Sequence, residues 1–216
     1  MITTVLLDVD GTLIDDNLLH VLAWSRAFRS LGHEIDATAL VHAIGMGGDR
    51  LVPAILGDAS GEVEEAQRLH AEEYRSAGLI RHAVALPGAA DLLAALRRRG
   101  VSTALASSAS AAELEPYLKL LGGADSVDVI VTREDVPETK PAPHLFAVAL
   151  ERLGRPRAMV VGDTVYDVAA ARELGLPCVG VLTGGIERRV LLEAGAAAVY
   201  EGVAALGGDL DHALAA

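Results

Sequence analysis

The opening stretch of the chain constrains its fold most strongly, because an apolar strand there runs directly into two acidic residues. In the segment 4–14, hydrophobic residues lead into Asp8, and one further hydrophobic residue separates Asp8 from Asp10. Alternate side chains of a strand point to the same face, so these two carboxylates can approach a common ligand. Carboxylates this close repel each other, and they are stable together mainly beside a cation or when one is protonated. The alternative is a strand that simply ends in an Asp-Gly turn.

Three later motifs have a similar setting. Ser107 follows the apolar run 101–106, Lys140 opens a Lys-Pro-Ala-Pro run, and Asp163 and Asp167 lie in Gly-Asp-Thr-Val-Tyr-Asp after another apolar strand. Taken singly, each has an ordinary interpretation: a helix cap for Ser107, a solvated loop cation for Lys140, and acids at a helix N-terminus for the Asp pair. The four motifs in this order form a much more specific signal than any one of them.

The motifs together resemble the haloacid dehalogenase superfamily of aspartate-dependent phosphohydrolases, whose first motif reads DxDGT, here residues 8–12. The resemblance is to the branch with a helical cap that includes phosphoglycolate phosphatases and beta-phosphoglucomutases. It implies Mg²⁺ as the cofactor and an aspartyl-phosphate intermediate. The site residues that it implies are Asp8, Asp10, Ser107 and Lys140 for catalysis, Asp8, Asp10, Asp163 and Asp167 for the metal, and Gly11, Thr12, Ser108, Gly47, Gly48 and Arg50 for the substrate.

Within this scheme Asp8 is the nucleophile, and Asp10 is the general acid and then the base for the attacking water. Asp10 would also hold the metal through its backbone carbonyl, and Asp167 would do so directly or through water. Ser107 would donate a hydrogen bond to a phosphoryl oxygen, and Lys140 would bridge nucleophile and phosphate. Because Asp8 must stay ionised while Asp10 must carry a proton, we expect their environments to separate their pKa values.

The order of secondary structure predicts a doubly wound α/β core with an inserted small helical cap. The second strand is not predicted to begin before Val101, and from there strands alternate with helices, which predicts a parallel sheet covered on both faces. Ligands of such sheets bind beyond the carboxyl ends of the strands, where all four motifs fall. Helices are predicted at 15–31, 37–44, 49–56 and 62–76, with no strand between them. The predicted division is therefore a core of residues 1–14 and 84–216, and a cap of residues 15–83.

Within the predicted cap, the loop 45–50 resembles the segment that closes over the substrate in related proteins. Gly47 and Gly48 permit close backbone approach, and Arg50 could meet a second anionic group; the alternative is an ordinary turn between helices. His20 lies near the hinge on the same helix face as Trp24, and packing in the core is its favoured interpretation.

Composition restricts the class of partner. The 216 residues are 51% hydrophobic and 22% charged, with a formal net charge of −12, which argues against binding to a nucleic-acid backbone. The single cysteine, Cys178, excludes an intramolecular disulfide, and neither a secretory signal nor a membrane span is expected. We therefore expect a cytoplasmic monomer or homodimer that acts on a small phosphorylated metabolite.

Two enzyme functions and one non-enzymatic function compete. The first is a Mg²⁺-dependent phosphatase, and the second is a sugar phosphomutase of the beta-phosphoglucomutase kind. A dehalogenase is disfavoured because those relatives lack an acid corresponding to Asp10, and a phosphonate hydrolase because the predicted cap contains no Lys. The third is a phospho-accepting signalling module or a silent binding protein, although a receiver domain needs neither a helical cap nor Asp10.

Overall fold

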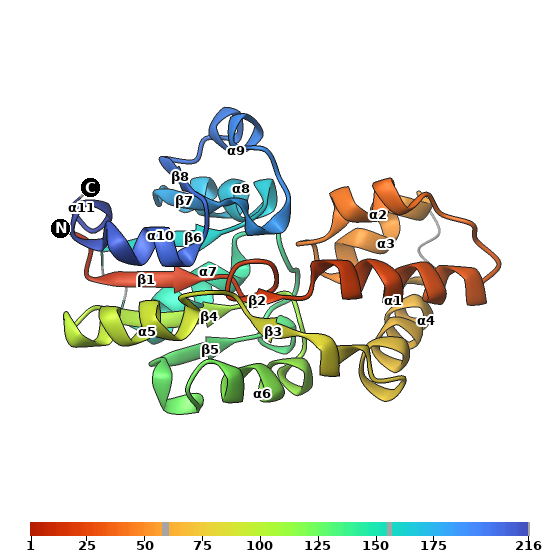
Figure 1. The fold of residues 1–216 in the computed structure, drawn as a ribbon. Helices are drawn as coiled ribbons and strands as arrows, with labels where there is room; N and C mark the ends of the chain where they lie inside the picture. Colours follow the sequence, from red (N-terminus) through yellow and green to blue (C-terminus); the bar gives the residue numbers. More distant parts are fainter. Residues whose placement is uncertain (58–60, 155–156, 216) are drawn as a thin grey trace.

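A six-stranded parallel sheet forms the centre of the protein in the computed structural model, which describes residues 1–57, 61–154 and 157–215 (Figure 1). The strand order is β5-β4-β1-β6-β7-β8, and every neighbouring pair is parallel. This confirms the predicted doubly wound α/β class. The strands are β1 Thr4–Leu7, β4 Ser102–Ala106, β5 Val129–Val131, β6 Ala158–Gly162, β7 Cys178–Val181 and β8 Ala198–Tyr200.

Helices cover both faces of the sheet, because alternate residues of a buried strand point to opposite sides. Val5 and Leu7 of β1 belong to one hydrophobic cluster, and Leu6 between them belongs to the other. The helices on the first face are α5 Ala89–Arg98, α6 Ala111–Leu120, α10 Val203–Gly208 and α11 Leu210–Ala213. Those on the second face are α7 His144–Arg152, α8 Val165–Glu173 and α9 Arg188–Ala194.

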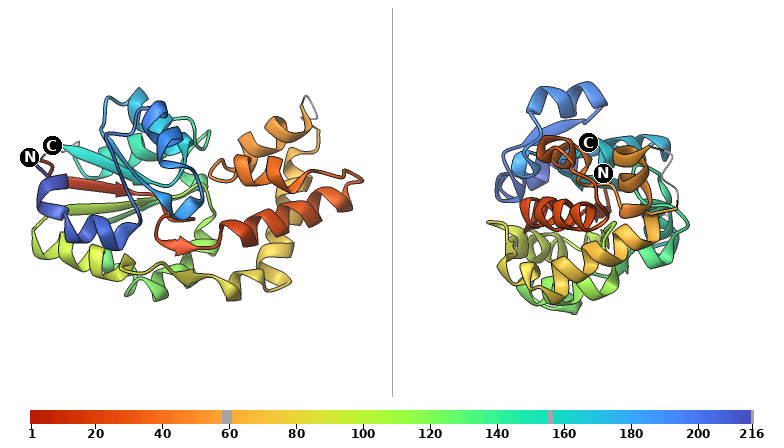
Figure 2. Two further views of the ribbon diagram at one scale, coloured as in Figure 1. Left: turned by 45° about the horizontal axis from the view of Figure 1, so that its top comes forward. Right: turned by 90° about the vertical axis from the view of Figure 1, so that its right-hand side faces the viewer.

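A helical insertion, defined here as α1 to α4, lies beyond the carboxyl ends of the strands, whereas both termini lie at the opposite end (Figures 1 and 2). It enters and leaves through a small antiparallel pair, β2 Ile14–Asp15 and β3 Val84–Ala85. Trp24 and Phe28 pack with residues of all four helices in a separate hydrophobic cluster. The helices are α1 Asn17–Ser30, α2 Ala37–Ala43, α3 Gly48–Leu56 and α4 Val63–Ala71, the last continued by a π-helical turn at Glu72–Ser76.

The expectation that no second strand occurs before Val101 is wrong. The two-residue strands β2 and β3 come earlier. The helix α5 also precedes Val101 and was not predicted from the sequence. A two-residue strand shows too little alternation to be recognised from sequence. The first helix begins at Asn17 rather than Asp15, because Asp15 pairs with Val84 in this small sheet. The proposed boundaries between core and cap stay a prediction.

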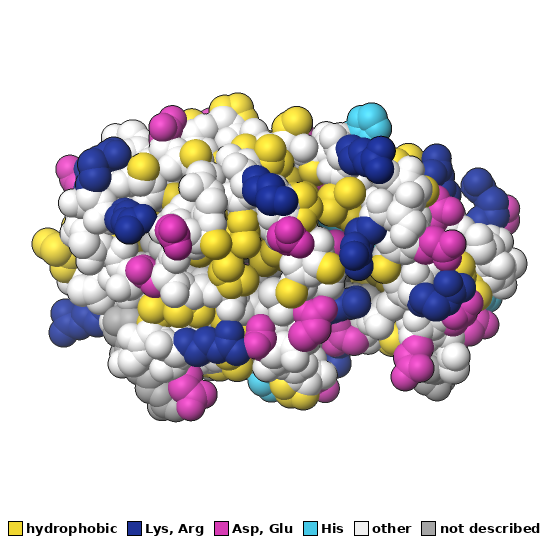
Figure 3. All heavy atoms as spheres, turned by 90° about the horizontal axis from the view of Figure 1, so that it is seen from below, with side chains coloured by type: hydrophobic (Ala, Val, Ile, Leu, Met, Phe, Trp, Pro, Cys, Tyr) yellow, Lys and Arg dark blue, Asp and Glu magenta, His cyan; other side chains and the backbone are white. Residues whose placement is uncertain are grey.

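The surface carries charges of both signs. On the face drawn in Figure 3, Lys and Arg side chains alternate with Asp and Glu side chains among apolar atoms. Within the described residues, no helix is long and apolar enough to cross a membrane.

Candidate active site

Three buried carboxylates meet at the carboxyl end of the sheet. Asp8 follows β1, Asp163 follows the neighbouring strand β6, and Asp167 lies in the first turn of α8. One carboxylate oxygen from each lies within 4.8 Å of the others, and the three residues are at most 2% exposed. This convergence follows from topology, because β1 and β6 are paired in parallel and therefore end at the same edge.

Lys140 supplies the positive charge inside this cluster. Its Nζ lies 2.5 Å from Asp8 Oδ1 and 2.9 Å from Asp167 Oδ1, and the residue is 1% exposed. Burial opposes its ionisation, but the charges of Asp167 and Asp8 outweigh burial and raise the Lys140 pKa. The other oxygen of Asp167 accepts hydrogen bonds from the backbone N–H and hydroxyl of Thr164, at 3.1 and 2.7 Å. Asp167 thus fixes the lysine through one oxygen and caps α8 through the other.

Asp163 is held by the turn that follows β1. Its two oxygens accept hydrogen bonds from Thr12 Oγ1 at 2.9 Å and from Asn17 Nδ2 at 3.0 Å. Gly11 has φ of +73°, and a Cβ there would lie 2.3 Å from Asp163 Oδ2. Only glycine tolerates both the positive φ and this close approach. The Thr12 hydroxyl and the absence of a side chain at Gly11 therefore position Asp163, and the expected contact of these two residues with substrate stays a prediction.

The carboxylate cluster fits a divalent cation with oxygen ligands. Burial, followed by repulsion from the neighbouring carboxylates, raises the pKa of Asp8 despite Lys140, and raises the pKa of Asp163 to about 7. One lysine therefore does not compensate the charge of three carboxylates. A hard cation such as Mg²⁺ takes carboxylate oxygens and would supply the missing charge.

Asp10 faces a different set of partners. Its Oδ2 accepts a hydrogen bond from Ser107 Oγ at 2.9 Å, and its Oδ1 lies 3.6 Å from His20 Nε2. The same His20 nitrogen lies 3.5 Å from Asp16 Oδ2, so the imidazole stands between two carboxylates. Ser107 Oγ also accepts from the backbone N–H of Ala109 at 2.9 Å, which fixes the hydroxyl at the end of β4.

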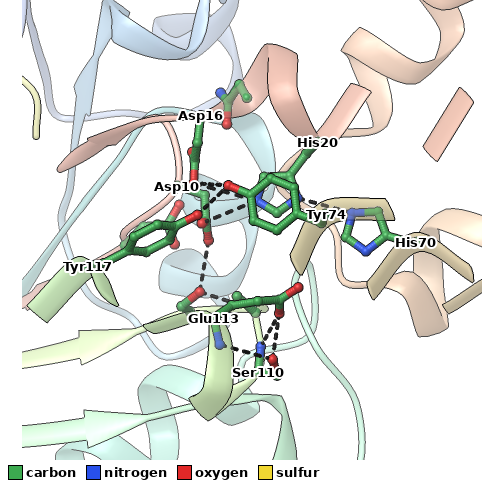
Figure 4. A network of polar contacts seen from close by, with 12 residues as sticks. Asp10, Asp16, His20, His70, Tyr74, Ser110, Glu113 and Tyr117 are labelled. Carbon is green, nitrogen blue, oxygen red and sulfur yellow. Dashed lines mark hydrogen bonds and ion pairs between the residues drawn. The ribbon is translucent and has the colours of Figure 1, made fainter. Parts of the chain in front are cut away.

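The polar network extends from Asp10 into the helical insertion (Figure 4). His20 Nδ1 lies 3.1 Å from His70 Nε2, and the His20 ring stacks on Tyr74 with ring centroids 3.9 Å apart. The Tyr74 hydroxyl donates to Asp16 Oδ2 at 3.2 Å and makes a short contact with the Tyr117 hydroxyl of α6. The interpretation of His20 as a residue of the hydrophobic core is therefore wrong, because its ring joins Asp10 to α1 and α4.

These contacts set the protonation states opposite to those expected. Burial alone would raise the Asp10 pKa, but the nearby His20 imidazole lowers it below its usual range. Burial likewise opposes ionisation of His20, and the neighbouring carboxylates of Asp10 and Asp16 raise its pKa to about 10. Asp8 has the raised pKa and Asp10 the lowered one. A cation beside Asp8 lowers its pKa, and a phosphate dianion beside Asp10 raises its pKa, so loading the site shifts both toward the expected states.

A hollow of about 530 Å³, measured with its open mouth, lies between the sheet edge and the helical insertion. Asp8, Asp10 and Lys140 line it, with Ser108 and Gly48 among the expected substrate contacts. The buried Ser108 hydroxyl has no hydrogen-bond partner among the described residues, so it remains available to a ligand.

Gly47 and Arg50 do not line this hollow, which differs from the expectation for both. The Gly47 N–H donates to Thr139 Oγ1 at 3.0 Å, and Arg50 Nη1 lies 3.9 Å from Glu138 Oε1 at the surface. Asp49 between them accepts from both the backbone N–H and the hydroxyl of Thr139. This part of the loop 45–50 thus binds the core segment that precedes Lys140.

Comparison with known proteins agrees with the fold. The model of the haloacid dehalogenase-like hydrolase family matches residues 2–175. The chain belongs to this family. Phosphoglycolate phosphatase from Rhodospirillum rubrum is 31% identical over 216 residues, which cover 94% of this chain and 88% of the relative.

Solved structures of the family superpose closely. A hydrolase from Pseudomonas syringae has a TM-score of 0.90 and 32% identity, covering 97% of this chain and 98% of its own. CbbY from Rhodobacter sphaeroides, in complex with xylulose-(1,5)bisphosphate, has a TM-score of 0.78 and 28% identity, covering 96% of this chain and 97% of its own. The chain is therefore an enzyme of the haloacid dehalogenase-like hydrolases, a family with phosphatases among its members.

Two residues that line the hollow of this family member, His70 and Arg133, were not predicted from the sequence. His70 and Tyr74 lie one helical turn apart, as His20 and Trp24 do, and this repeated spacing of ring-bearing residues was the available signal. Arg133 lies two residues after the end of β5, with Thr132 between them. The rule that ligands bind at the carboxyl ends of strands therefore applied to Arg133 as well.

Proposed function

We propose that the chain is a Mg²⁺-dependent phosphomonoester hydrolase that acts on a small phosphorylated metabolite through an aspartyl-phosphate intermediate. The observation that carries this proposal is the buried contact of Lys140 with Asp8, at 2.5 Å, inside a cluster of three carboxylates that borders the hollow. The contact orients the Asp8 carboxylate and offers one cation to an incoming phosphate. The family and the printed names of its phosphatase members support the same reaction class.

In the proposed reaction, a carboxylate oxygen of Asp8 attacks phosphorus and the bond from phosphorus to the ester oxygen breaks. Asp10 gives its proton to the departing oxygen, which leaves as an alcohol. Asp10 then takes a proton from water as the water oxygen attacks phosphorus. The bond between phosphorus and Asp8 breaks, inorganic phosphate leaves, and both carboxyl groups return to their starting states.

Other side chains hold the reacting groups. Ser107 and Ser108 lie beside Asp10 and in the wall of the hollow, where their hydroxyls can donate to phosphoryl oxygens. In this proposal Asp8, Asp163 and the Asp10 carbonyl bind Mg²⁺, and Asp167 chiefly orients Lys140. When bound, Mg²⁺ offsets the negative charge that gathers on the phosphoryl oxygens.

The lining of the hollow supports hydrolysis over the phosphomutase alternative. A mutase must keep its phosphorylated aspartate from water until a sugar hydroxyl arrives. Among the described residues, the helical insertion contributes neither Lys nor Arg to the lining of the hollow, so it offers few anchors for a retained sugar phosphate. The lining from this side is mainly Trp24, Ile44, Met46 and His70.

We expect the protein to release phosphate from para-nitrophenyl phosphate with Mg²⁺ and to lose this activity with a chelator. With beta-glucose 1-phosphate and a trace of the 1,6-bisphosphate, we expect inorganic phosphate without net glucose 6-phosphate. Both products are measured in the same reaction. Accumulation of glucose 6-phosphate without matching phosphate release would instead establish the mutase, and absence of phosphate release from para-nitrophenyl phosphate as well would refute the phosphatase.

The metal should also change how stability depends on pH. The pKa of Asp163 is about 7 because burial and the Asp167 charge disfavour its ionised form. A raised carboxyl pKa stabilises the fold below the ordinary value of 3.8, and this contribution is lost as pH rises through about 7. With a chelator, we expect the melting temperature to fall between pH 6 and pH 8. Calorimetry should show Mg²⁺ raising it more at pH 8, and equal shifts at both pH values would contradict the metal assignment.

A further inference from the structure

The hollow contains one cation whose charge is not used by the site described above. Lys140 is held between Asp8 and Asp167, and His20 lies between two carboxylates. The other basic residues in the lining are His70 and Arg133. Burial, with the charges of His20 and Arg133, lowers the His70 pKa well below 6.5, so His70 is neutral at physiological pH. Among the residues that the structure describes, Arg133 is therefore the remaining cation of the wall.

Arg133 is anchored by its backbone and open at its side chain. Its N–H donates to the carbonyl of Ala109 at 3.2 Å, which ties it to the loop that carries Ser107 and Ser108. Its Nε lies 3.7 Å from Glu134 Oε1, but both side chains are at least one-third exposed, and such surface pairs contribute about 0–1 kcal/mol. Among the described residues, its guanidinium makes no hydrogen bond. Its terminal nitrogens are available for a planar, bidentate anion.

The sheet order places this cation at a defined distance from the nucleophile. Asp8 follows β1 and Arg133 follows β5, and β4 lies between these strands. Neighbouring strands are ~4.8 Å apart, so the two strand ends are separated by about 10 Å. Asp8 and Arg133 line the same hollow. A substrate with its phosphate at Asp8 could thus reach Arg133 with a second anionic group.

We propose that Arg133 forms a second anion-binding subsite and that the enzyme prefers phosphomonoesters carrying a second anionic group, either a carboxylate or another phosphate. This inference rests on the proposed phosphatase function and narrows its substrate class. Ser108, whose buried hydroxyl has no partner among the described residues, lines the same hollow. Glu113 also lines the hollow; its Oε2 accepts from the N–H and hydroxyl of Ser110, both at 2.7 Å, which holds this carboxylate at the start of α6.

A structural role for Arg133 is the competing interpretation. Its side chain also borders a second hollow, lined by Asp49 and Gln67 of the helical insertion and by Thr139 of the core. Arg133 could assist closure of the helical insertion over any substrate. The two interpretations separate by substrate: a closure role affects every phosphomonoester, whereas an anion subsite affects only those with a second charge.

The test compares Arg133→Met with the wild type on matched pairs of substrates. One pair is 2-phosphoglycolate and 2-hydroxyethyl phosphate, which differ by a carboxylate; the other is xylulose 1,5-bisphosphate and xylulose 5-phosphate. We expect kcat/KM for the doubly anionic member to fall about 10- to 100-fold, the loss typical of a hydrogen bond to a charged group. We expect kcat/KM for the other member and for para-nitrophenyl phosphate to change less than about 2-fold, in the range of an exposed substitution.

Two controls define the outcome. Arg189→Met removes an arginine that is 74% exposed on α9 and should leave both ratios unchanged, while Arg133→Lys should keep part of the preference. The larger loss identifies whether the second anion is the carboxylate or the phosphate. An equal loss on all substrates, or no loss on either pair, would overturn the subsite. If the wild type released no phosphate even from para-nitrophenyl phosphate, the proposed function itself would fail instead.

Discussion

Asp8→Asn is expected to lower phosphate release by at least about 10⁴-fold, because an amide cannot replace a carboxylate as the attacking nucleophile. The substitution is nearly isosteric at a residue that is 2% exposed, so it leaves packing intact. It also removes a carboxyl group whose pKa is raised by burial and by neighbouring carboxylates, which means that its ionised form is disfavoured at this position. We therefore expect the metal-free variant to be at least as stable as the wild type at pH 8. Steady-state kinetics and thermal unfolding measure the two effects separately.

The matched control for this variant is Asp211→Asn, which changes a carboxylate that is 86% exposed and paired with Arg99; Asp211 lies on α11, at the end of the sheet opposite the site (Figure 1). It should retain wild-type activity and stability, because exposed ion pairs contribute little. An Asp8→Asn variant that is folded and turns over at the wild-type rate would remove Asp8 from the mechanism.

Lys140→Ala should affect both stability and activity. The side chain is 1% exposed and is the charge partner of Asp8 and Asp167, so its removal leaves buried carboxylates uncompensated. Breaking a buried ion pair by deleting one partner costs about 3–5 kcal/mol. For a protein of this size, that corresponds to a fall in melting temperature of about 6–20 °C. Loss of one positioned positive charge should also lower kcat by about 10²- to 10³-fold.

Differential scanning calorimetry in the presence of a chelator measures this stability loss. Mg²⁺ should restore part of it, because the cation supplies charge to the same carboxylates. The control is Lys119→Ala, whose side chain is 75% exposed and lies 3.5 Å from Glu115 on α6. Equal melting temperatures for Lys140→Ala and Lys119→Ala would show that the buried lysine does not stabilise the carboxylate cluster.

The sequence was most informative where chain direction and strand alternation act together. Asp8, Ser107 and Asp163 each follow an apolar strand, and a parallel sheet brings such ends to one edge, so their convergence was predictable. Strand alternation also predicts that the side chains of Asp8 and its neighbour Val9 point in opposite directions, and Val9 is fully buried in the hydrophobic core.

Contacts between distant segments were not predictable in this way. His20 and His70 meet because α1 and α4 pack side by side, and the angle of that packing is not encoded in either helix alone. Arg50 was expected at the substrate because of its charge, yet α3 turns its side chain toward Glu138 at the surface. Periodicity indicates which face of a helix is apolar, but not which side chain of another helix will stand opposite its polar edge.

Local propensity also left one element unassigned. Residues 84–100 contain the two-residue strand β3 and the helix α5, whose Leu92, Leu93 and Leu96 are buried against the sheet. This apolar spacing is typical of a helix, but no helix was predicted in this segment, which lies between the predicted cap and the strand predicted from Val101. The small β2–β3 sheet is specified by pairing across the helical insertion, which no local pattern reveals.

The most direct test of the central claim is a pre-steady-state measurement on Asp10→Asn with para-nitrophenyl phosphate and Mg²⁺. Nitrophenolate leaves without needing a proton, so Asp8 can still be phosphorylated, whereas hydrolysis of the aspartyl-phosphate lacks its general base. We expect a rapid burst of nitrophenolate that is stoichiometric with enzyme and is followed by slow turnover. In the double variant that also carries Asp8→Asn, we expect no burst. A burst of the same amplitude in the double variant would contradict the assignment of Asp8 as the nucleophile.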